Sequence, residues 1–349
     1  MMEDEMDQGS RRSATVRDNA TARKRPHARS TGAAKAHVLR LERSGAQWPV
    51  WNTTLQLVVT SRDQLADAQR LVIDQVAAID DACNPFRPDS EVRMLQQARG
   101  RQVRVSPLLA ELVAVSIRAA VISDGDLDPL YDPLYDDVLQ ERDGDLLWMR
   151  PRIGTADLHS PSVPGWRRIR RDGRRLTVPA GALLDLSAMA AAHAVDRCAR
   201  LIHRRFNVGV RVDIGGDVAC AGQPPSAGWE TLLRTGEAGP NIPAEVGPTP
   251  FAVARSVGHR WPGGGGKPAG YTFHPSTSRV TVSVWRSVSV AAFPCTHAKA
   301  LSMSAMMRGH AATGWLHRLG ASARLVAANG EVITVGRWPA HEAGCWTTR

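Results

Sequence analysis

The stretch WRSVSVAAFPCTHAKALSMSAMMRG, residues 285–309, changes its pattern halfway along. Residues 285–294 read as a β-strand that ends at a proline. From Cys295 onward the residues are small or are methionines, as on the packed face of a helix. Lys299 interrupts this face, although only four of the 44 basic residues in the chain are lysines. We therefore predict a strand followed by a helix, with one lysine among residues that otherwise look packed.

The sequence around this unit mixes strands and helices without regular alternation. Residues 54–59 alternate as in a half-buried strand, whereas apolar residues in 63–84 recur at spacings of three and four, as in an amphipathic helix. Because no βαβ repeat runs through the chain, we predict a single α+β domain. Further predicted elements are a short helix capped by Ser90, a helix over 106–125, a strand end and helix over 182–206, and hairpins turning at 172–173 and 329–330.

The first 36 residues differ in composition from the rest. They contain many basic residues and almost no large apolar ones, so we expect a disordered tail, followed by a folded domain over residues 37–349. This tail holds a dense share of the +10 net charge. We therefore favour a solubilising or incidental extension over a nucleic-acid-binding arm, and we do not expect a nucleic-acid partner.

The cysteines bear on the compartment. There are five, an odd number, far apart and without a C-x-x-C pair, which is typical of reduced thiols and argues against a zinc site. No stretch has the pattern of a secretory signal or a membrane span. We therefore predict a cytoplasmic protein without a membrane partner.

Four motifs allow more than one interpretation. The run GGGGK at 263–267 lacks the other residues of a phosphate loop, and the acidic loop from Asp124 has Pro129 where a calcium loop needs glycine, so both are interpreted as ordinary loops. Asp185 stands where a strand runs into a helix and is either an N-cap or part of an anion site. Gly215 and Gly216 interrupt a strand pattern, which indicates a bulge or a close approach of the backbone.

Taken in order, five segments resemble one family. They are IDDACNPFRPDSEVRMLQ, DGDLDP, LDLSAMAAAHAVDRC, VDIGGDVACAG and WRSVSVAAFPCTHAKALSMSAMMRG, and the likeness spans about residues 48–338. They resemble the FAD:protein FMN transferase (ApbE-like) family, particularly its actinobacterial-type branch. The resemblance implies a single α+β domain that binds FAD, uses magnesium at the pyrophosphate, and moves FMN to a serine or threonine hydroxyl of a target flavoprotein.

The resemblance also assigns site residues. Ala188 falls at a position where the family contributes a backbone carbonyl to the metal, and Lys299 falls where it has a magnesium-binding aspartate. The positions that the resemblance assigns to the flavin are Trp51, Phe86, Asp126, Leu127, Asp128, Asp185, Ala191, Gly215, Gly216, Asp217 and Tyr271.

The two side chains that bind magnesium in the family are replaced in this chain, according to the resemblance. Lys299 and Met303 are four residues apart and so share one helix face, but neither offers the oxygen that magnesium prefers. Two hypotheses stay open for this chain. In one, it transfers FMN with Lys299 as the catalytic cation that replaces the metal. In the other, it is a non-catalytic flavin-binding or protein-interaction domain. Lys299 could also simply reach from the helix edge to water.

Overall fold

The computed structural model describes residues 45–51, 53–131, 163–226, 228–234, 241–246, 251–257, 259–260, 270–274 and 279–338. All of them belong to one compact unit, Leu41–Arg349. The predicted tail, residues 1–36, lies outside the described residues, as do the GGGGK stretch and Cys345.

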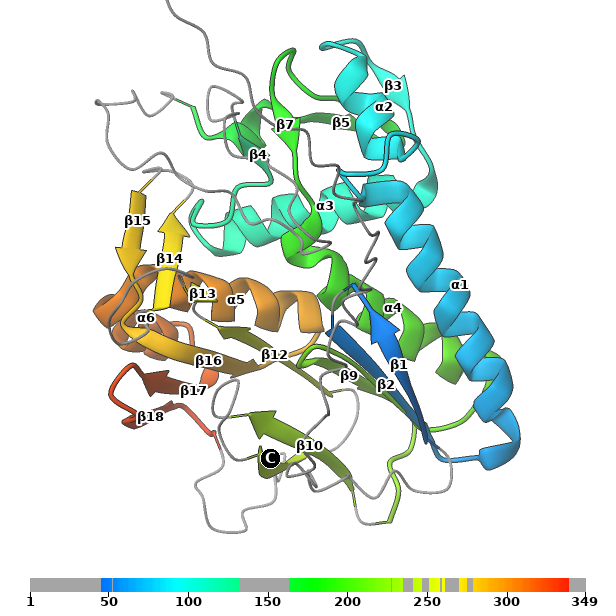
Figure 1. Cartoon of the computed structure of the whole chain (residues 1–349), viewed down its shortest axis with the longest axis vertical. Helices are drawn as coiled ribbons and strands as arrows, with labels where there is room; N and C mark the ends of the chain where they lie inside the picture. The colour runs from blue at the N-terminus through cyan, green and yellow to red at the C-terminus, as the bar shows by residue number, and fades with distance from the viewer. Residues whose placement is uncertain are drawn as a thin grey trace, which may run out of the picture. The chain divides into compact units, whose positions relative to one another are not determined.

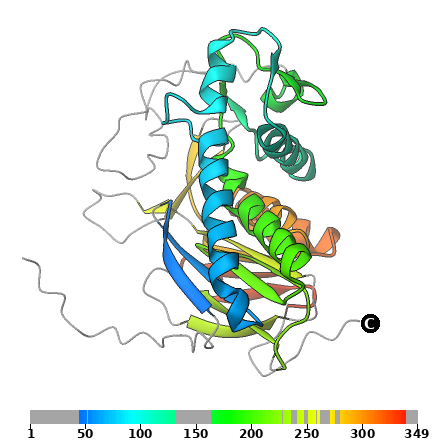
Figure 2. The same ribbon diagram turned by 90° about the vertical axis from the view of Figure 1, so that its right-hand side faces the viewer.

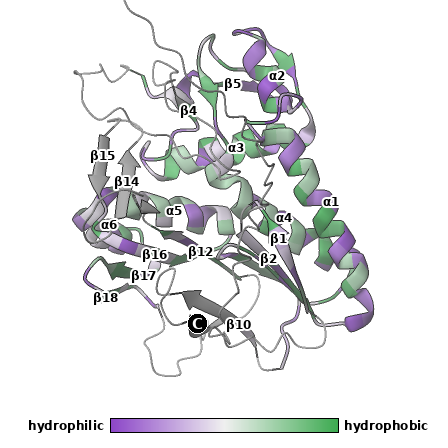
Figure 3. Ribbon diagram, viewed as in Figure 1, coloured by the Kyte–Doolittle hydropathy of each residue, from purple (hydrophilic) through white to green (hydrophobic). Residues whose placement is uncertain are grey.

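The fold is organised around one eight-stranded antiparallel sheet (Figure 1). Its strands, in spatial order, are β1 (Gly45–Val50), β2 (Thr53–Val59), β8 (Val210–Ile214), β9 (Asp217–Ala221), β12 (Phe251–Val257), β16 (Trp285–Ala291), β17 (Ser322–Ala327) and β18 (Val332–Val335). Figure 3 shows hydrophobic residues along these strands, as expected for a sheet that is covered by other elements.

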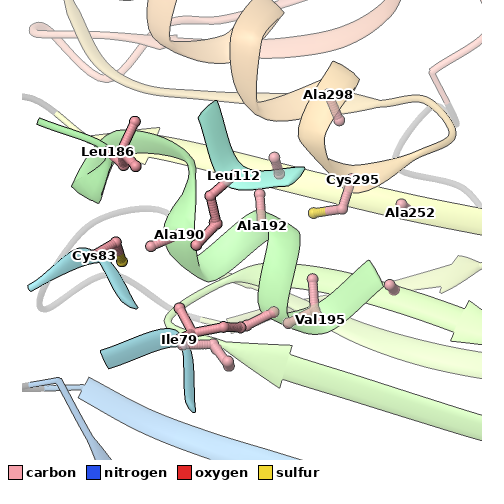
Figure 4. Packing of buried hydrophobic residues seen from close by; sticks show 14 of the residues in the cluster. Ile79, Cys83, Leu112, Leu186, Ala190, Ala192, Val195, Ala252, Cys295 and Ala298 are labelled. Atoms are coloured by element: carbon pink, nitrogen blue, oxygen red, sulfur yellow. The ribbon is translucent and has the colours of Figure 1, made fainter. Parts of the chain in front are cut away.

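Helices cover one face of this sheet (Figure 2). The helix α4 (Ser187–Phe206) packs on β8 and β9, and α5 (Cys295–Arg308) packs on β12 and β16. Two more helices, α1 (Leu65–Cys83) and α3 (Pro107–Ile122), pack against α4. Figure 4 shows Ile79 of α1, Leu112 of α3, Val195 of α4 and Cys295 of α5 in the resulting core, and all four are buried. Because α4 and α5 also contact each other, they form one layer over the sheet.

The other face of the sheet is covered in part by two tryptophans. Trp229 packs with Val218 and Cys220, and Trp338 packs with Val253. Both tryptophans are buried. The central strands therefore have apolar contacts on both faces.

Smaller elements surround this core. The helical ones are α2 (Glu91–Gln97), α6 (Ala312–Arg318) and the 3-10 turns η1 (Arg62–Gln64), η3 (Gly165–Arg168) and η4 (Gly309–Ala311). Two small three-stranded sheets are β3 (Val103–Arg104), β6 (Arg175–Thr177), β5 (Arg170–Asp172) and β13 (His259–Arg260), β14 (Gly270–His274), β15 (Arg279–Val282). Two strand pairs are β4 (Leu130–Tyr131) with β7 (Leu183–Leu184) and β10 (Trp229–Arg234) with β11 (Asn241–Val246).

The structure confirms the predicted α+β class and the helices and hairpins derived from sequence pattern. Ser106 caps α3 by accepting a hydrogen bond from the Leu109 amide at 3.0 Å. Gly173 and Gly330 occupy the predicted turns with positive φ. Among the described residues, Cys83, Cys198, Cys220 and Cys295 are buried free thiols, and no helix combines the length and apolarity that crossing a membrane requires.

One local prediction was wrong in detail, and one of two alternatives was excluded. Ser90 precedes α2 as predicted, but its hydroxyl donates to the Arg87 carbonyl oxygen at 3.0 Å and accepts no amide of the first turn. Gly215 and Gly216 do not form a bulge within one strand. They form the two-residue turn that joins β8 to β9, with φ values of 62° and 95°, which is the conformation that tight hairpins require.

Candidate functional site

Lys299 points inward from α5. Its Nζ lies 3.1 Å from Oδ1 and 3.0 Å from Oδ2 of Asp217, the first residue of β9. A third contact, of 3.3 Å, reaches the carbonyl oxygen of Arg255 on β12. The Lys299 side chain is only 16% exposed and that of Asp217 only 3%. An ammonium has three N–H donors, so the neighbouring strands provide an acceptor for each. The interpretation that Lys299 reaches outward to water is therefore wrong.

The turn before Asp217 fixes the position of its carboxylate. Gly216 donates its amide to Asp213 Oδ1 at 3.0 Å, and Arg211 donates to Asp213 Oδ2 at 3.0 Å. A Cβ on Gly215 would lie 2.9 Å from Thr53 Oγ1, so the close backbone approach that the sequence suggested is present here. Asp217 therefore follows this turn directly and reaches α5 from the start of β9.

Burial governs the electrostatics of this pair. Burial raises the pKa of Asp217, and the ammonium of Lys299 beside it counteracts this effect. Burial likewise raises the pKa of Asp213, against the effect of Arg211. Both carboxylates are therefore held in a low-polarity environment by nearby cations, Lys299 for Asp217 and both Arg211 and Arg255 for Asp213.

The loop 126–128 packs against the middle and the end of α5. Asp126 accepts a hydrogen bond from Arg308 Nε at 2.5 Å, and the guanidinium of Arg308 stacks over the Trp315 ring at 4.2 Å. Leu127 lies in one apolar cluster with Met189, Ala300 and Met303. The structure thus brings together this loop, the start of α4 and the Met303 side of α5.

Asp128 turns away from α5. Its Oδ1 accepts from the Leu130 amide at 2.9 Å, and burial raises its pKa against hydrogen bonds from the amides of Leu130, Trp166 and Gly165. Next to it, Trp166 Nε1 is buried and has no hydrogen-bond partner among the residues that the structure describes. This indole donor was not predicted as a site residue, since nothing in the sequence shows that residue 166 returns to the 125–128 loop.

Asp185 lies one position before Leu186, the N-cap residue of α4, so it is not the N-cap that the sequence suggested as one alternative. Its Oδ1 accepts from the Ser187 amide at 2.8 Å, at the start of α4. Its own amide donates to the Pro129 carbonyl oxygen at 2.8 Å. Cys83, at the end of α1, lies within electrostatic reach, because burial raises its pKa to about 12 with smaller contributions from Asp185 and Asp80. The first turn of α4 also contains Ala188, and half-buried Ala191 follows.

Two of the predicted flavin positions, Trp51 and Phe86, lie beside the end of α1. Trp51 donates from Nε1 to Asp80 Oδ1 at 3.2 Å, and it has a positive φ of 44°. Phe86 is 49% exposed and is positioned by its amide, which donates to Asn84 Oδ1 at 2.9 Å. Tyr271 lies on β14, a strand that contacts α5, and its side chain is not among the described parts.

A hollow lies away from these residues. It has a volume of about 260 Å³ and lies between α3, α4 and the start of α5, lined by Arg118, His193, Asp196 and Arg200 among others. Asp196 accepts hydrogen bonds from the amides of Cys295 at 2.8 Å and Thr296 at 3.0 Å, and so caps α5. Because none of the predicted site residues lines this hollow, it is not treated as the candidate site.

The residues present do not fit a magnesium ion. The ammonium of Lys299 already contacts both oxygens of the Asp217 carboxylate. Met303 offers only a thioether, which is a poor ligand for this hard cation. Within the described ranges, no three His, Cys, Asp or Glu side chains are grouped so that they could hold a metal. Ala188 could contribute only a backbone oxygen.

Comparisons with known proteins point to one family and one fold. A model described as the ApbE family matches residues 51–325. No curated protein sequence matches the chain. Among solved structures, the fold is similar to the apo flavinyl transferase ApbE of Pseudomonas stutzeri, with 19% identity and a TM-score of 0.69 over 84% of this chain and 94% of that one.

Two further structures are similar to the same extent. The flavin transferase ApbE of Vibrio cholerae has 18% identity and a TM-score of 0.64, covering 84% of this chain and 97% of that one. The ApbE protein of Thermotoga maritima has 20% identity and a TM-score of 0.68, covering 83% of this chain and 96% of that one. At these identities the likeness establishes a shared fold.

Proposed function

The chain belongs to the ApbE family, and we propose that it is an FAD-binding protein of the flavin transferase type in which an internal ion pair replaces magnesium. The observation that carries this proposal is the contact of Lys299 Nζ with both carboxylate oxygens of Asp217 and with the Arg255 carbonyl oxygen. In this protein the cation at the position of the family's metal aspartate is part of the chain itself.

The proposed loss of metal has a chemical consequence. Moving FMN from FAD to a hydroxyl joins that oxygen to the FMN phosphorus and breaks its bond to the AMP oxygen, with negative charge developing on the phosphate oxygens. Phosphoryl transfer depends on cations that neutralise this charge. The ammonium of Lys299 is a poor substitute, because Asp217 already balances its charge and its three N–H groups already have acceptors.

FAD binding is favoured by a separate observation. In the described part of the chain, Trp166 Nε1 is buried without a hydrogen-bond partner beside Gly125. An unpaired buried donor is costly unless a ligand or water accepts from it. A flavin ring carries carbonyl oxygens and ring nitrogens that could accept this hydrogen bond. Leu127 and Met189 would supply apolar contact beside it, since both belong to the cluster that includes Met303.

The alternative is an active transferase that modifies a serine or threonine of a target flavoprotein. It is supported by the arrangement of Asp126, Asp185 and Asp217 around α4 and α5 in a chain of this family. We favour binding without transfer, because a buried and fully paired lysine leaves no free cation at this position.

The experiment separates binding from transfer. Purified protein is mixed with FAD, with magnesium or with a chelator, and both quenching of flavin fluorescence and release of AMP are measured. We expect quenching that does not depend on magnesium, and no AMP. Trp166→Phe should weaken FAD binding several-fold, whereas Trp48→Phe, on β1, should not. Magnesium-dependent AMP release by the wild-type chain would contradict the proposal, and absence of quenching would remove FAD from it.

A further inference from the structure

The small sheet β3–β6–β5 and the residues leading into it form a second notable region. We call residues 99–104 together with residues 165–175 the arginine sheet. These two segments contain nine arginines, at positions 99, 101, 104, 167, 168, 170, 171, 174 and 175, and a single acidic residue, Asp172. Strand pairing brings them together, since Arg104 lies opposite Arg175 and Arg170 lies opposite Thr177.

The pairing puts like charges side by side. Arg175 has Arg104 as its partner on one side and Asp172 on the other, and directly opposite residues share a face of the sheet. A hollow of about 480 Å³ adjoins this sheet and is lined by Gly100, Arg167, Arg168, Arg170, Thr177 and Pro179. Like charges in this arrangement repel each other, so the sheet gains from any polyanion that lies across it.

Few carboxylates lie near this region within the described residues: Asp172 lies opposite Arg175, and Asp128 is within electrostatic reach of Arg168. Eight of the nine arginines are exposed and Arg168 is half-buried. Within the described part of the chain none of the nine forms an ion pair, whereas Arg87, Arg197, Arg211 and Arg308 each pair with a carboxylate. Among the described residues, the side chains of Arg101 and Arg174 make hydrogen bonds, and both donate to backbone carbonyl oxygens.

The arginine sheet holds a larger share of the net positive charge than the N-terminal tail does. Residues 1–36 contain eight basic and five acidic residues, a smaller excess than the nine arginines and one aspartate of the arginine sheet. The expectation that the tail accounts for the basic excess was therefore incomplete. Strand pairing collects arginines that are about 70 residues apart in the sequence, which a linear count does not show.

The chemistry of the surface distinguishes between classes of partner. Protein interfaces have an apolar centre depleted of charge, but the two apolar residues of the paired strands face the core: Leu176 is fully buried, and Val103 packs on the main cluster. What remains outside is almost entirely guanidinium, which matches rows of phosphates. We propose that the arginine sheet binds the phosphate backbone of a nucleic acid without reading its sequence.

The test is fluorescence anisotropy with a labelled DNA duplex of about 20 base pairs, titrated with the full chain at several salt concentrations. The variant Arg104→Gln/Arg170→Gln/Arg175→Gln removes three charges from one face. The control Arg62→Gln/Arg204→Gln/Arg318→Gln removes three exposed charges elsewhere. Circular dichroism verifies that both fold.

We expect binding that weakens as salt rises, and a salt slope that is smaller in magnitude by about 2 to 3 in the sheet variant but nearly unchanged in the control, since each phosphate contact contributes about 0.9 to that slope. Equal loss in both variants would overturn the proposal, because general charge would then explain binding. Displacement by polyglutamate as readily as by unlabelled duplex would assign the surface to acidic proteins. Binding that appears only when the acidic residues of 136–145 are neutralised would assign it to the chain's own acidic stretch.

Discussion

Lys299 on α5 and Arg175 on β6 are both cations held by strands and helices, but their surroundings are opposite. Lys299 is mostly buried and touches both oxygens of one carboxylate, whereas Arg175 is exposed and lies opposite another arginine. Burial makes an unpaired charge very unfavourable, so the chain supplies an internal partner for Lys299. Water screens the exposed charges, so the arginine sheet can stay unpaired until a ligand arrives.

The largest expected effect is on the buried pair. Lys299→Met leaves Asp217 buried without its cation, and removing one partner of a buried pair costs about 3–5 kcal/mol of unfolding free energy. The double variant Lys299→Met/Asp217→Asn should recover most of this loss. Urea denaturation of both variants measures it. If the single variant were as stable as the wild type, Lys299 would be a surface residue in solution.

Acid should lower the free energy of unfolding through a second buried group, His193. Burial lowers the pKa of His193 to about 4, so the folded protein keeps it neutral while the unfolded chain protonates it near pH 6.5. Stability from this residue is present above pH 6.5 and falls as the pH drops toward 4, by on the order of 1–2 kcal/mol at pH 5. Denaturation at pH 7 and pH 5 measures the loss, which should be smaller in His193→Gln.

The carboxyl group of Asp196 has the opposite effect on stability over part of this pH range, so the wild type must be compared with His193→Gln. Burial raises the pKa of Asp196 to about 6, so its contribution to stability improves as the pH falls below 6. The pH dependence of stability in the wild type alone therefore reports the sum of the His193 and Asp196 contributions. An equal loss in the wild type and in His193→Gln would show that His193 is not buried as a neutral ring.

Two turns offer a matched comparison of the regions. Gly215 precedes Asp217 and Gly173 lies in the arginine sheet, with φ values of 62° and 55°. Either glycine replaced by alanine should cost about 1 kcal/mol for the left-handed backbone. Gly215→Ala should cost more, because its Cβ would meet Thr53 Oγ1 at 2.9 Å, whereas nothing lies within 4 Å at Gly173. Thermal unfolding measures both, and equal losses would contradict the crowding at Gly215.

The smallest effect is expected in the arginine sheet. Arg104→Gln/Arg170→Gln/Arg175→Gln removes repulsion between exposed charges, so stability should rise or stay within about 0.5 kcal/mol of the wild type. Added salt should stabilise the wild type slightly more than this variant, since salt screens exposed charges. A loss above 2 kcal/mol in thermal or urea unfolding would mean that these side chains have internal partners.

Local pattern was sufficient for much of the fold. The spacing of apolar residues in 65–83 and the dipeptides at 172–173 and 329–330 report on neighbours in sequence, and the structure confirms them as α1 and two turns. The Pro/Gly-rich region after residue 222 gave no such pattern, and the strands β10 and β11 within it were not predicted.

The candidate site was harder to predict because its contacts join distant segments. Lys299 and Asp217 are 82 positions apart and Arg308 and Asp126 are 182 apart, and nothing in the spacing of residues links them. One signal was available: Lys299 and Asp217 are each a lone charge among small or apolar neighbours, and two such charges of opposite sign are candidates for a pair. The same reasoning could not find Trp166, whose Nε1 has no hydrogen-bond partner among the described residues.

The most direct measurement is calorimetric titration of magnesium, with FAD present, into the wild-type chain and into Lys299→Asp/Met303→Thr, which restores two oxygen-bearing side chains on one helix face. If the ion pair replaces the metal, the wild type gives no binding heat and the double variant gives a saturable one. Saturable magnesium binding by the wild-type chain would contradict the replacement of magnesium by Lys299 and Asp217.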